Sequence, residues 1–305
     1  MVLVYGEILV ELNKDINSNT FSYHVGGAPF NVGYCIHNME GNVKFVGNVG
    51  NDLMGKFIVD FVNSKGINSC IDVGEYNTTL AFVMNDSNGE RDFCFYRNNT
   101  ADYHFNYDFL CFIKECDIVH LGSLMLSKKE GYSFFKEVVK ISKDNKKLLS
   151  FDVNYRDDIF GEKKEAIGIY KEVIKDFDIV KISKDELLLL SNEEDVSLGV
   201  SKLFTNNQMV FITLGKEGSL FYYGGKYSKV GSIEVEVVDT TGAGDAFYGV
   251  ILSFIDKLGI EGFIKDVNKY LYIANVMGAY ATLKKGALEG VLSKEELMKV
   301  SKYEE

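Results

Sequence analysis

A carboxylate directly follows a glycine-rich turn toward the C-terminal end of the sequence. Thr241 and the triplet Gly242, Ala243 and Gly244 lead into Asp245, and an apolar segment that predicts a helix follows. Small residues let the backbone approach an anion, and the first amides of a helix point toward such a ligand. The turn is therefore a candidate anion hole. Asp245 either accepts the proton of an attacking hydroxyl group or charges the first turn of the helix, and the motif alone leaves both interpretations open.

The turn differs from two common nucleotide-binding motifs. The sequence contains no GxxxxGK(S/T) loop, and Phe247 occupies the position of the third glycine in a dinucleotide fingerprint. No acidic residue follows the turn at the distance where a second strand would contact a ribose. These differences argue against an oxidoreductase that uses a dinucleotide.

Other candidate ligand-binding residues lie beside glycines or in predicted strands. Gly26 and Gly27 allow the backbone to contact a ligand, and Asn31 offers both a donor and an acceptor to a hydroxyl group. A plain turn at the start of a helix is the alternative. Glu11 and Arg97 either bind a polar ligand or lie on exposed strand faces.

These residues require a fold that brings distant segments together. Short β-branched runs alternate with longer amphipathic segments, which predicts a doubly wound α/β fold with a mostly parallel sheet. Residues 78–97 break this alternation and predict a hairpin that is a candidate lid, to which residues 13–27 could add strands. We expect one domain, residues 1–305, with a small β lid inserted from about 9–25 and 70–104.

The composition excludes several classes of function. With a formal net charge of −11 and no long basic run, the chain is not expected to bind nucleic acid. Five cysteines without a CxxC pair suit buried thiols in a reducing compartment, and four scattered histidines show no metal-ligand spacing. The N-terminus lacks the basic region of a signal peptide, and no apolar stretch reaches the roughly 18 residues of a membrane span. We therefore expect a soluble cytoplasmic protein without a membrane partner.

The segment DTTGAGDAF, residues 239–247, resembles the C-terminal signature of the ribokinase-like (PfkB-type) carbohydrate kinases. The likeness covers nearly the whole chain and is greatest to the bacterial fructokinases of that family. It implies a ribokinase-like fold in which Asp245 is the catalytic base and the turn before it forms the anion hole. Arg156, in a segment similar to the family's D-x-N-x-R strand end, would stabilise charge on the transferred phosphoryl group.

The same resemblance implies a set of sugar-binding residues. Residues 26–55 look like the family's N-terminal signature, whose glycines and asparagine line the sugar pocket. Glu11 stands where fructokinases usually carry an aspartate, which leaves the identity of the sugar open. Arg97 matches a lid arginine of fructokinases and 2-keto-3-deoxygluconate kinases, where it would clamp a carboxylate or phosphate. The implied sugar-binding residues are Glu11, Gly26, Gly27, Asn31, Arg97 and Asn154.

Nucleotide contacts are implied by further segments. KISKDELLLL looks like the family's N-x-x-E pattern, in which the glutamate organises Mg²⁺ through water, although Ser-x-x-Glu is also a capping box. FITLGKEGSLFYY resembles the nucleotide loop, and one helix residue fits beside adenine. The implied nucleotide-binding residues are Ser183, Glu186, Thr213, Gly215, Gly218 and Asn275. Asp239 together with residues 284–286 resembles the monovalent-cation loop of some relatives.

The predicted function is an ATP-dependent sugar kinase that uses Mg²⁺ and, through Asp239, a monovalent cation such as K⁺. Fructose is the expected acceptor, with 2-keto-3-deoxygluconate, another ketose or a pentose as alternatives. A sugar-binding regulator on the same scaffold is the alternative that is not an enzyme, and the intact Asp245 argues against it. An exposed lid sheet can pair with its twin, so we also expect a homodimer through the lid.

Overall fold

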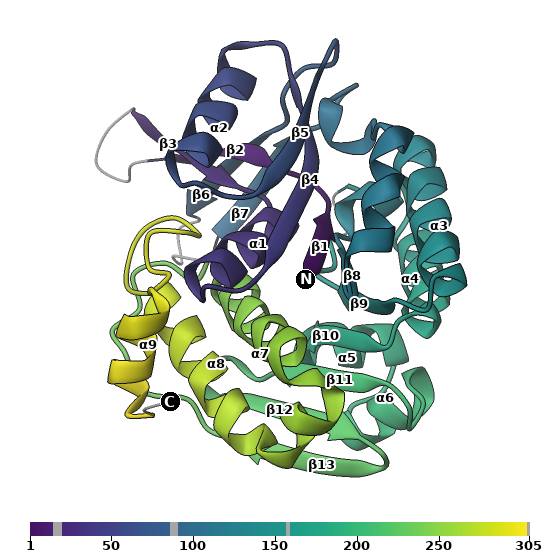
Figure 1. Ribbon diagram of the computed structural model, residues 1–305, viewed down its shortest axis with the longest axis vertical. Coiled ribbons are helices and arrows are strands. Elements are labelled where there is room, and N and C mark those ends of the chain that lie inside the picture. The colour runs from purple at the N-terminus through teal and green to yellow at the C-terminus, as the bar shows by residue number, and fades with distance from the viewer. Residues whose placement is uncertain (15–19, 86–90, 157–158, 304–305) are drawn as a thin grey trace.

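The computed structural model describes residues 1–14, 20–85, 91–156 and 159–303 (Figure 1). The strands in these ranges are β1 (Val2–Tyr5), β2 (Leu9–Lys14), β3 (Phe21–Gly26), β4 (Val43–Gly50), β5 (Ser69–Gly74), β6 (Leu80–Asn85), β7 (Arg91–Tyr96), β8 (Ile118–Leu121), β9 (Leu148–Asp152), β10 (Ile179–Ser183), β11 (Met209–Thr213), β12 (Ser219–Tyr223) and β13 (Lys226–Val230).

The helices are α1 (Ala28–Asn38), α2 (Leu53–Ser64), α3 (Lys129–Asp144), α4 (Lys163–Val173), α5 (Lys184–Ser191), α6 (Val196–Leu203), α7 (Ala243–Lys265), α8 (Val267–Ala281) and α9 (Lys294–Ser301). Short 3-10 helices are η1 (Ala101–Tyr103), η2 (Tyr107–Glu115), η3 (Leu124–Ser127), η4 (Ile174–Asp176) and η5 (Gly215–Glu217).

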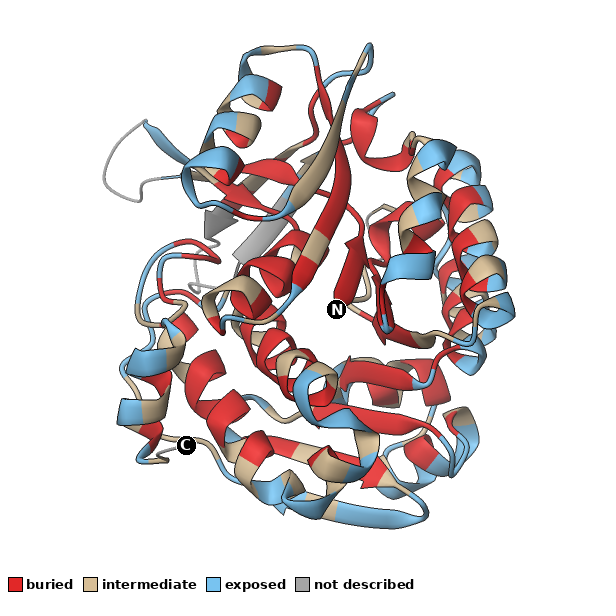
Figure 2. Cartoon of the chain, in the orientation of Figure 1, coloured by how far each residue is buried: buried red, intermediate tan, exposed pale blue. Residues whose placement is uncertain are grey.

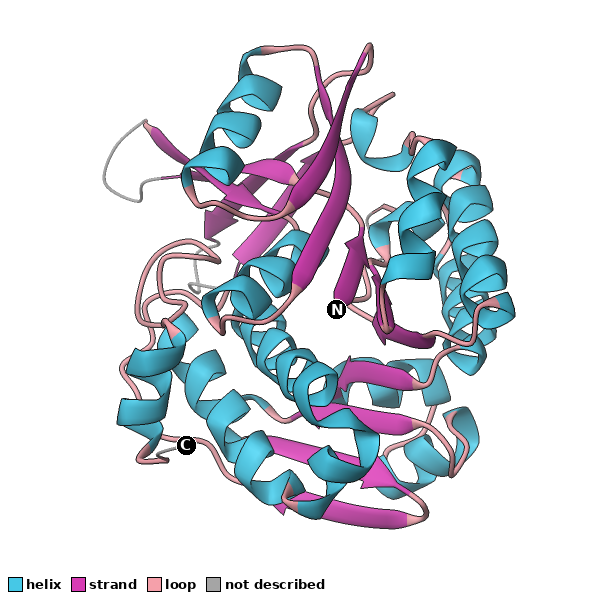
Figure 3. Ribbon diagram, viewed as in Figure 1, coloured by secondary structure: helices cyan, strands magenta, loops and turns pink. Residues whose placement is uncertain are grey.

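Two sheets organise these elements (Figure 3). Within the described ranges, the large sheet has nine strands in the order β13-β12-β11-β10-β9-β8-β1-β4-β5. Its strands run parallel from β5 to β11, and β12 and β13 add an antiparallel hairpin at one edge. The predicted doubly wound, mostly parallel sheet is therefore confirmed.

Helices cover both faces of the large sheet, which explains its long apolar strands. In β1, Val2 and Val4 belong to a buried cluster with α1, α2, α7, α8 and α9. Leu3 and Tyr5, which point the other way, belong to a cluster with α3, α4, α5 and α6. A parallel strand buried on both faces has no polar side, and β1 is buried at all of its positions (Figure 2).

The smaller sheet contains the strands predicted as a lid, so we call it the lid, and it has the order β3-β2-β6-β7 in the described ranges. The sequence prediction placed the second lid insertion at about 70–104, but β5 pairs in parallel with β4 and is the edge strand of the large sheet. A short β-branched strand fits either sheet equally well, so the sequence pattern did not distinguish them. The predicted hairpin turn at 86–90, and residues 15–19 of the other insertion, lie outside the described residues.

The winding of the sheet changes direction next to β1. The chain passes from β1 through α1 to β4 on one side, whereas β8 to β11 follow on the other side with α3 to α6 on the opposite face. Open α/β sheets bind ligands beyond the carboxyl ends of their strands at such a reversal. The lid lies over this end of the molecule (Figure 1).

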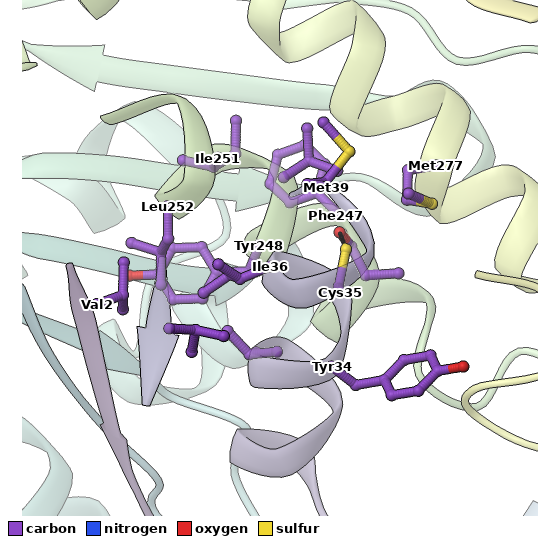
Figure 4. Close-up of a cluster of buried hydrophobic side chains, with 14 of the residues drawn as sticks. Val2, Tyr34, Cys35, Ile36, Met39, Phe247, Tyr248, Ile251, Leu252 and Met277 are labelled. Carbon is purple, nitrogen blue, oxygen red and sulfur yellow. Dashed lines mark hydrogen bonds between the residues drawn. The ribbon is translucent and has the colours of Figure 1, made fainter. Parts of the chain in front are cut away.

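Helix α1 packs closely against α7 in the core cluster of Figure 4. Cys35 Sγ donates to the carbonyl of Ala246 over 3.2 Å. A Cβ atom on Gly249 would lie 2.6 Å from Cys35 Cβ, so this position requires glycine. The close approach packs the second half of α1 against the first two turns of α7.

Candidate active site

The candidate anion hole, residues 241–244, leads into α7, and we call it the anion turn. Gly242 adopts φ 76°, a left-handed conformation that favours glycine, and no side chain among the described residues caps the helix. A Cβ atom on Gly242 would lie 2.7 Å from Ala287 Cβ, which gives a second reason for glycine. An α-helix that begins without a side-chain cap offers its first amides and its positive end to a ligand.

Asp245 lies in the first turn of α7 and is 9% exposed. Its Oδ2 accepts a hydrogen bond of 2.8 Å from Nδ2 of Asn31, at the start of α1. Burial raises the pKa of Asp245, and the charge of Lys181, the Asn31 hydrogen bond and the charge of Arg156 oppose this rise. The carboxylate is therefore bound to the neighbouring helix and does not cap its own.

Two cavities meet at this turn. The first, which we call the polar cavity, has a volume of about 300 Å³ and extends from the turn to the lid. It is lined by eight of the predicted residues, Glu11, Gly27, Asn31, Asn154, Arg156, Gly242, Gly244 and Asp245, and by nine others, Glu7, Leu9, Ala28, Ala81, Phe95, Leu124, Lys181, Thr240 and Thr241.

The second cavity, which we call the apolar cavity, has a volume of about 600 Å³. Its walls include Ile233, Val235, Val237 and Phe247, and the predicted residues Thr213, Gly215, Gly218, Ala243, Gly244 and Asn275. Within the described residues, Thr240 and Gly244 are the positions that line both cavities. A ligand in each cavity would therefore meet its neighbour at the anion turn.

The family is decided by comparison with known proteins. The model of the pfkB family carbohydrate kinases matches residues 1–294. The chain belongs to this family. Probable fructokinase-5 of Arabidopsis thaliana is 32% identical, and the match covers 99% of this chain and 97% of that protein.

Solved structures of fructokinases also resemble this pfkB-family kinase. Fructokinase of Xylella fastidiosa with bound ATP has a TM-score of 0.89 and 25% identity, covering 99% of this chain and 98% of that one. A double mutant of Vibrio cholerae fructokinase, in a form with bound fructose, ADP and potassium ion, has a TM-score of 0.87 and 28% identity. That match covers 98% of this chain and 97% of the Vibrio cholerae chain.

Two glycines shape the lid side of the kinase's polar cavity. Gly27 has φ 114°, and a Cβ atom there would lie 2.5 Å from the carbonyl oxygen of Glu7. Gly26, which was predicted to contact the sugar, is not among the residues lining the cavity. A Cβ atom on Gly26 would lie 2.4 Å from Glu11 Oε1, so this glycine makes room for the Glu11 carboxylate.

Arg97, which was predicted to clamp the substrate, is not among the residues that line the polar cavity. Arg97 is 7% exposed, and its Nε donates to Asp102 Oδ2 over 2.8 Å. It also donates to Ser127 Oγ and to the carbonyl of Leu124. Arg97 thus joins the end of β7 to η1 and η3 and attaches the lid to the core.

Ser183 and Glu186 form the capping box that the sequence left as an alternative to nucleotide binding. Ser183 Oγ accepts from the amide of Glu186 over 3.2 Å, and Glu186 Oε2 accepts from the amide of Ser183 over 2.7 Å. Glu186 Oε1 accepts from the amide of Tyr155 over 2.7 Å. Neither residue lines either cavity, but Glu186 fastens the segment that carries Asn154 and Arg156.

Asn275 and Asp239 also organise loops. Asn275 Nδ2 donates to the carbonyls of Val230 and Gly231, over 3.1 and 3.2 Å, at the edge of the apolar cavity. Asp239 accepts from the amides of Thr241 and Gly286, over 2.7 and 2.8 Å. Asp239 therefore connects the anion turn to the segment 284–286 that the sequence analysis paired with it.

Glu7 and Lys181 line the polar cavity although the sequence analysis did not select them. Glu7 is 2% exposed, and within the described residues its Oε2 has no hydrogen-bond partner. Burial raises the pKa of Glu7 to about 8. Lys181 interrupts the apolar run of Ile179, Val180 and Ile182 in β10, and a charged residue inside such a run was the sequence signal for it. Glu7 lies two residues beyond the end of β1, on the side of the sheet where ligands bind.

Among the described residues, no group of three or more His, Cys, Asp or Glu is placed to hold a metal ion. In the same part of the chain, no helix combines the length and the apolar character needed to cross a bilayer.

Proposed function

We propose that the kinase is an ATP-dependent fructokinase that transfers the γ-phosphoryl group to a primary hydroxyl of fructose. The observation that carries this proposal is the position of Asp245 and the anion turn at the junction of the two cavities. The related structures support the choice of ligands, because one contains ATP and another contains fructose and ADP. The polar cavity would hold the sugar, and the apolar cavity would hold the nucleoside.

Phosphoryl transfer requires mainly positioning and stabilisation of charge. Asp245 would take the proton of the attacking hydroxyl, for which its burial and raised pKa make it a better base than an exposed aspartate. The amides at the start of α7 and the guanidinium of Arg156 would stabilise the phosphoryl group. Asn31 Nδ2 donates one hydrogen bond to Asp245 and so holds the base in place. Within the described residues the buried Oδ1 of Asn31 has no partner, so it can accept a hydrogen bond from a sugar hydroxyl.

Mg²⁺ would reach this site with the nucleotide, since Mg²⁺ is usually held by substrate phosphates and one or two carboxylates. Glu186 fits a water-mediated role, because each of its oxygens accepts one backbone amide and an oxygen of a carboxylate has a second lone pair. When bound, the ion would neutralise charge on the phosphates. A potassium ion is present in the Vibrio cholerae structure, and we place a corresponding monovalent-cation site beside Asp239 and residues 284–286.

The direct test is ADP release from MgATP with fructose, other ketoses, ribose and 2-keto-3-deoxygluconate as acceptors. We expect turnover with fructose and a loss of about 10²–10⁴-fold in Asp245→Asn. Asp185→Asn, at an exposed aspartate in the first turn of α5, is the matched control and should keep wild-type turnover. Turnover only with an acceptor that carries a carboxylate would identify a 2-keto-3-deoxygluconate kinase. Binding of sugar or ATP with no ADP release from any acceptor would instead identify a regulator.

A second copy of the chain is the partner we propose for the outer face of the lid. The side chains of Phe21, Tyr23 and Tyr96 are 40%, 56% and 60% exposed on the lid strands. Phe21 and Tyr96 each contact Phe82, with ring centroids 5.6 and 5.0 Å apart, so the face is a continuous apolar patch. Light scattering should give a dimer that Tyr96→Lys dissociates, and a wild-type monomer would refute this assembly.

A further inference from the structure

Lys181 occupies an unusual position for a cation. It lies on β10 directly opposite Asp152 of β9, and its Nζ donates to Asp152 Oδ2 over 3.0 Å. Both residues are buried, with exposures of 6% and 2%, yet Lys181 forms part of the wall of the polar cavity. A buried ammonium group is costly to desolvate unless carboxylates or a ligand surround it.

The ammonium lies against the first turn of α7. A Cβ atom built on Gly244 would be 2.8 Å from Lys181 Nζ and 3.2 Å from its Cε. The start of a helix carries partial positive charge, so a cation is unfavourable there unless negative charge is held between the two. Two carboxylates supply that charge, namely Asp152 on the side of the sheet and Asp245 within the turn itself.

We propose that Lys181 is a positioning residue of the phosphoryl-transfer step, whose buried ammonium keeps the neighbouring carboxylate of Asp245 ionised and ready to accept a proton. The inference rests on the role proposed above for Asp245 as the base. Asp152 anchors the ammonium from the opposite side, through the sheet register. A side chain at position 244 would displace the ammonium.

The charges around this cluster agree with that role. Burial alone would lower the pKa of Lys181, but the carboxylates of Asp152, Glu186 and Asp245 reverse this effect and raise it. Lys181 also makes the largest of the contributions that limit the rise in the pKa of Asp245. The ammonium therefore stays protonated while it holds the base deprotonated.

Other titratable groups from several elements interact with Asp245. They are Arg156 after β9, Glu186 of α5, Glu7 after β1, Asp152 of β9 and Cys35 of α1. Burial raises the pKa of the Cys35 thiol, which stays neutral. His120 of β8 faces Lys181, and burial together with the charge of Lys181 lowers its pKa to about 3. Lys181 and Arg156 are thus the positive charges in this set.

The pH profile of kcat/KM separates this role from a structural one. Lys181→Met should move the acidic limb to higher pH by about 1–3 units, because an opposite charge at this range lowers a carboxyl pKa by that amount. Asp152→Asn, which removes a negative charge and keeps the ammonium, should move the limb to lower pH. Lys181→Arg should restore most of the wild-type limb. A uniform loss of activity in Lys181→Met with an unmoved limb would overturn the proposal.

A second readout does not depend on turnover. In protein labelled with ¹³C at aspartate carboxyl carbons, the resonance that is missing in Asp245→Asn reports the titration of Asp245. We expect this resonance to titrate at higher pH in Lys181→Met and at lower pH in Asp152→Asn. An unchanged midpoint in both variants would overturn the role of Lys181. If no acceptor gives ADP release but the midpoints move as expected, the proposed function fails while the electrostatic role of Lys181 is retained.

Discussion

The ion pairs Arg97–Asp102 and Lys181–Asp152 are both buried, yet the fold uses their cations differently. Arg97 donates to Asp102, Ser127 and the carbonyl of Leu124 and is not among the residues that line the polar cavity. Lys181 donates to Asp152 and lies on the wall of the polar cavity. The first cation holds two parts of the protein together, and the second is available to the chemistry.

The carboxylates of the two pairs also differ, both in their hydrogen-bond donors and in the direction in which their pKa is shifted. Asp102 Oδ1 accepts from the hydroxyls of Thr79 and Thr100, and despite burial its pKa is lowered by Arg97 and by these hydrogen bonds. Burial raises the pKa of Asp152, which has Lys181 as an opposing charge. Within the described residues Asp152 Oδ1 has no hydrogen-bond partner. The number of donors around each carboxylate thus decides whether a buried pair is fixed or adjustable.

The largest expected effect concerns stability. Arg97→Ala leaves Asp102 buried without its cation, and we expect a loss of about 3–5 kcal/mol in the free energy of unfolding. Lys181→Met should lower the free energy of unfolding by less, because the carboxyl group of Asp152, whose pKa is already raised, can take up a proton. Urea unfolding of both variants, with exposed Lys184→Ala as the control, measures the difference. An equal loss of unfolding free energy in the two variants would show that the two ion pairs do not differ in their contribution to stability.

The next effect is on turnover. A methyl group in Gly244→Ala would lie 2.8 Å from Lys181 Nζ, and we expect kcat to fall about 10–100-fold because the ammonium must move. Gly168→Ala, where nothing lies within 4 Å of the added carbon, is the control. In the Lys181→Met background the same substitution should cost much less, since the displaced group is gone. Fully additive losses would break the link between Gly244 and Lys181.

Glu7 extends the comparison to a buried carboxyl that has no cation bound to its Oε2. With a folded pKa of about 8, Glu7 is protonated at neutral pH in the native state, whereas in the unfolded chain it ionises near pH 4.5. Native stability attributable to this group therefore falls as pH rises from 4.5 to about 8 and is constant above that. Glu7→Gln should gain more than about 1 kcal/mol over wild type between pH 5 and pH 8 in urea unfolding. A pH-independent difference would contradict burial of a neutral carboxyl.

The smallest effect belongs to a more exposed pair. His24 Nδ1 of lid strand β3 lies 2.8 Å from Glu289 Oε1, and this hydrogen bond raises the pKa of His24 against the effect of burial. The stabilisation is complete below the unfolded pKa of 6.5 and is lost as pH rises through the higher folded value. Because Glu289 is 40% exposed, we expect only about 0.2–1 kcal/mol between wild type and His24→Gln at pH 6. The difference should vanish at pH 9, and its persistence there would assign it to packing.

Features defined by local backbone could be predicted from the sequence. The anion turn, Asp245 and the glycines of the apolar cavity depend on a few consecutive residues, and the structure places them around the two cavities. The alternation of strand and helix likewise gave the correct sheet, because each apolar run must be buried on both faces. Asn31 and Glu11 were found through the family signature and lie in the polar cavity.

Features that depend on distant partners could not be predicted in this way. Arg97 lies in the expected segment, but Ser127 and Leu124, from a separate part of the chain, take its donors. Lys181 is adjacent to Asp152 only through strand register, and β5 joined the large sheet through pairing with β4. Gly26 serves the Glu11 carboxylate on the paired strand β2, which a linear motif does not reveal.

The limited overlap of the two cavities has a consequence for engineering. Within the described residues, Thr240 and Gly244 are the positions common to both walls. Residues such as Glu7, Glu11 and Phe95 contribute to the polar cavity and not to the other. Directed evolution at these positions would therefore change the wall of the cavity proposed for the acceptor and leave the wall of the cavity proposed for the nucleoside intact.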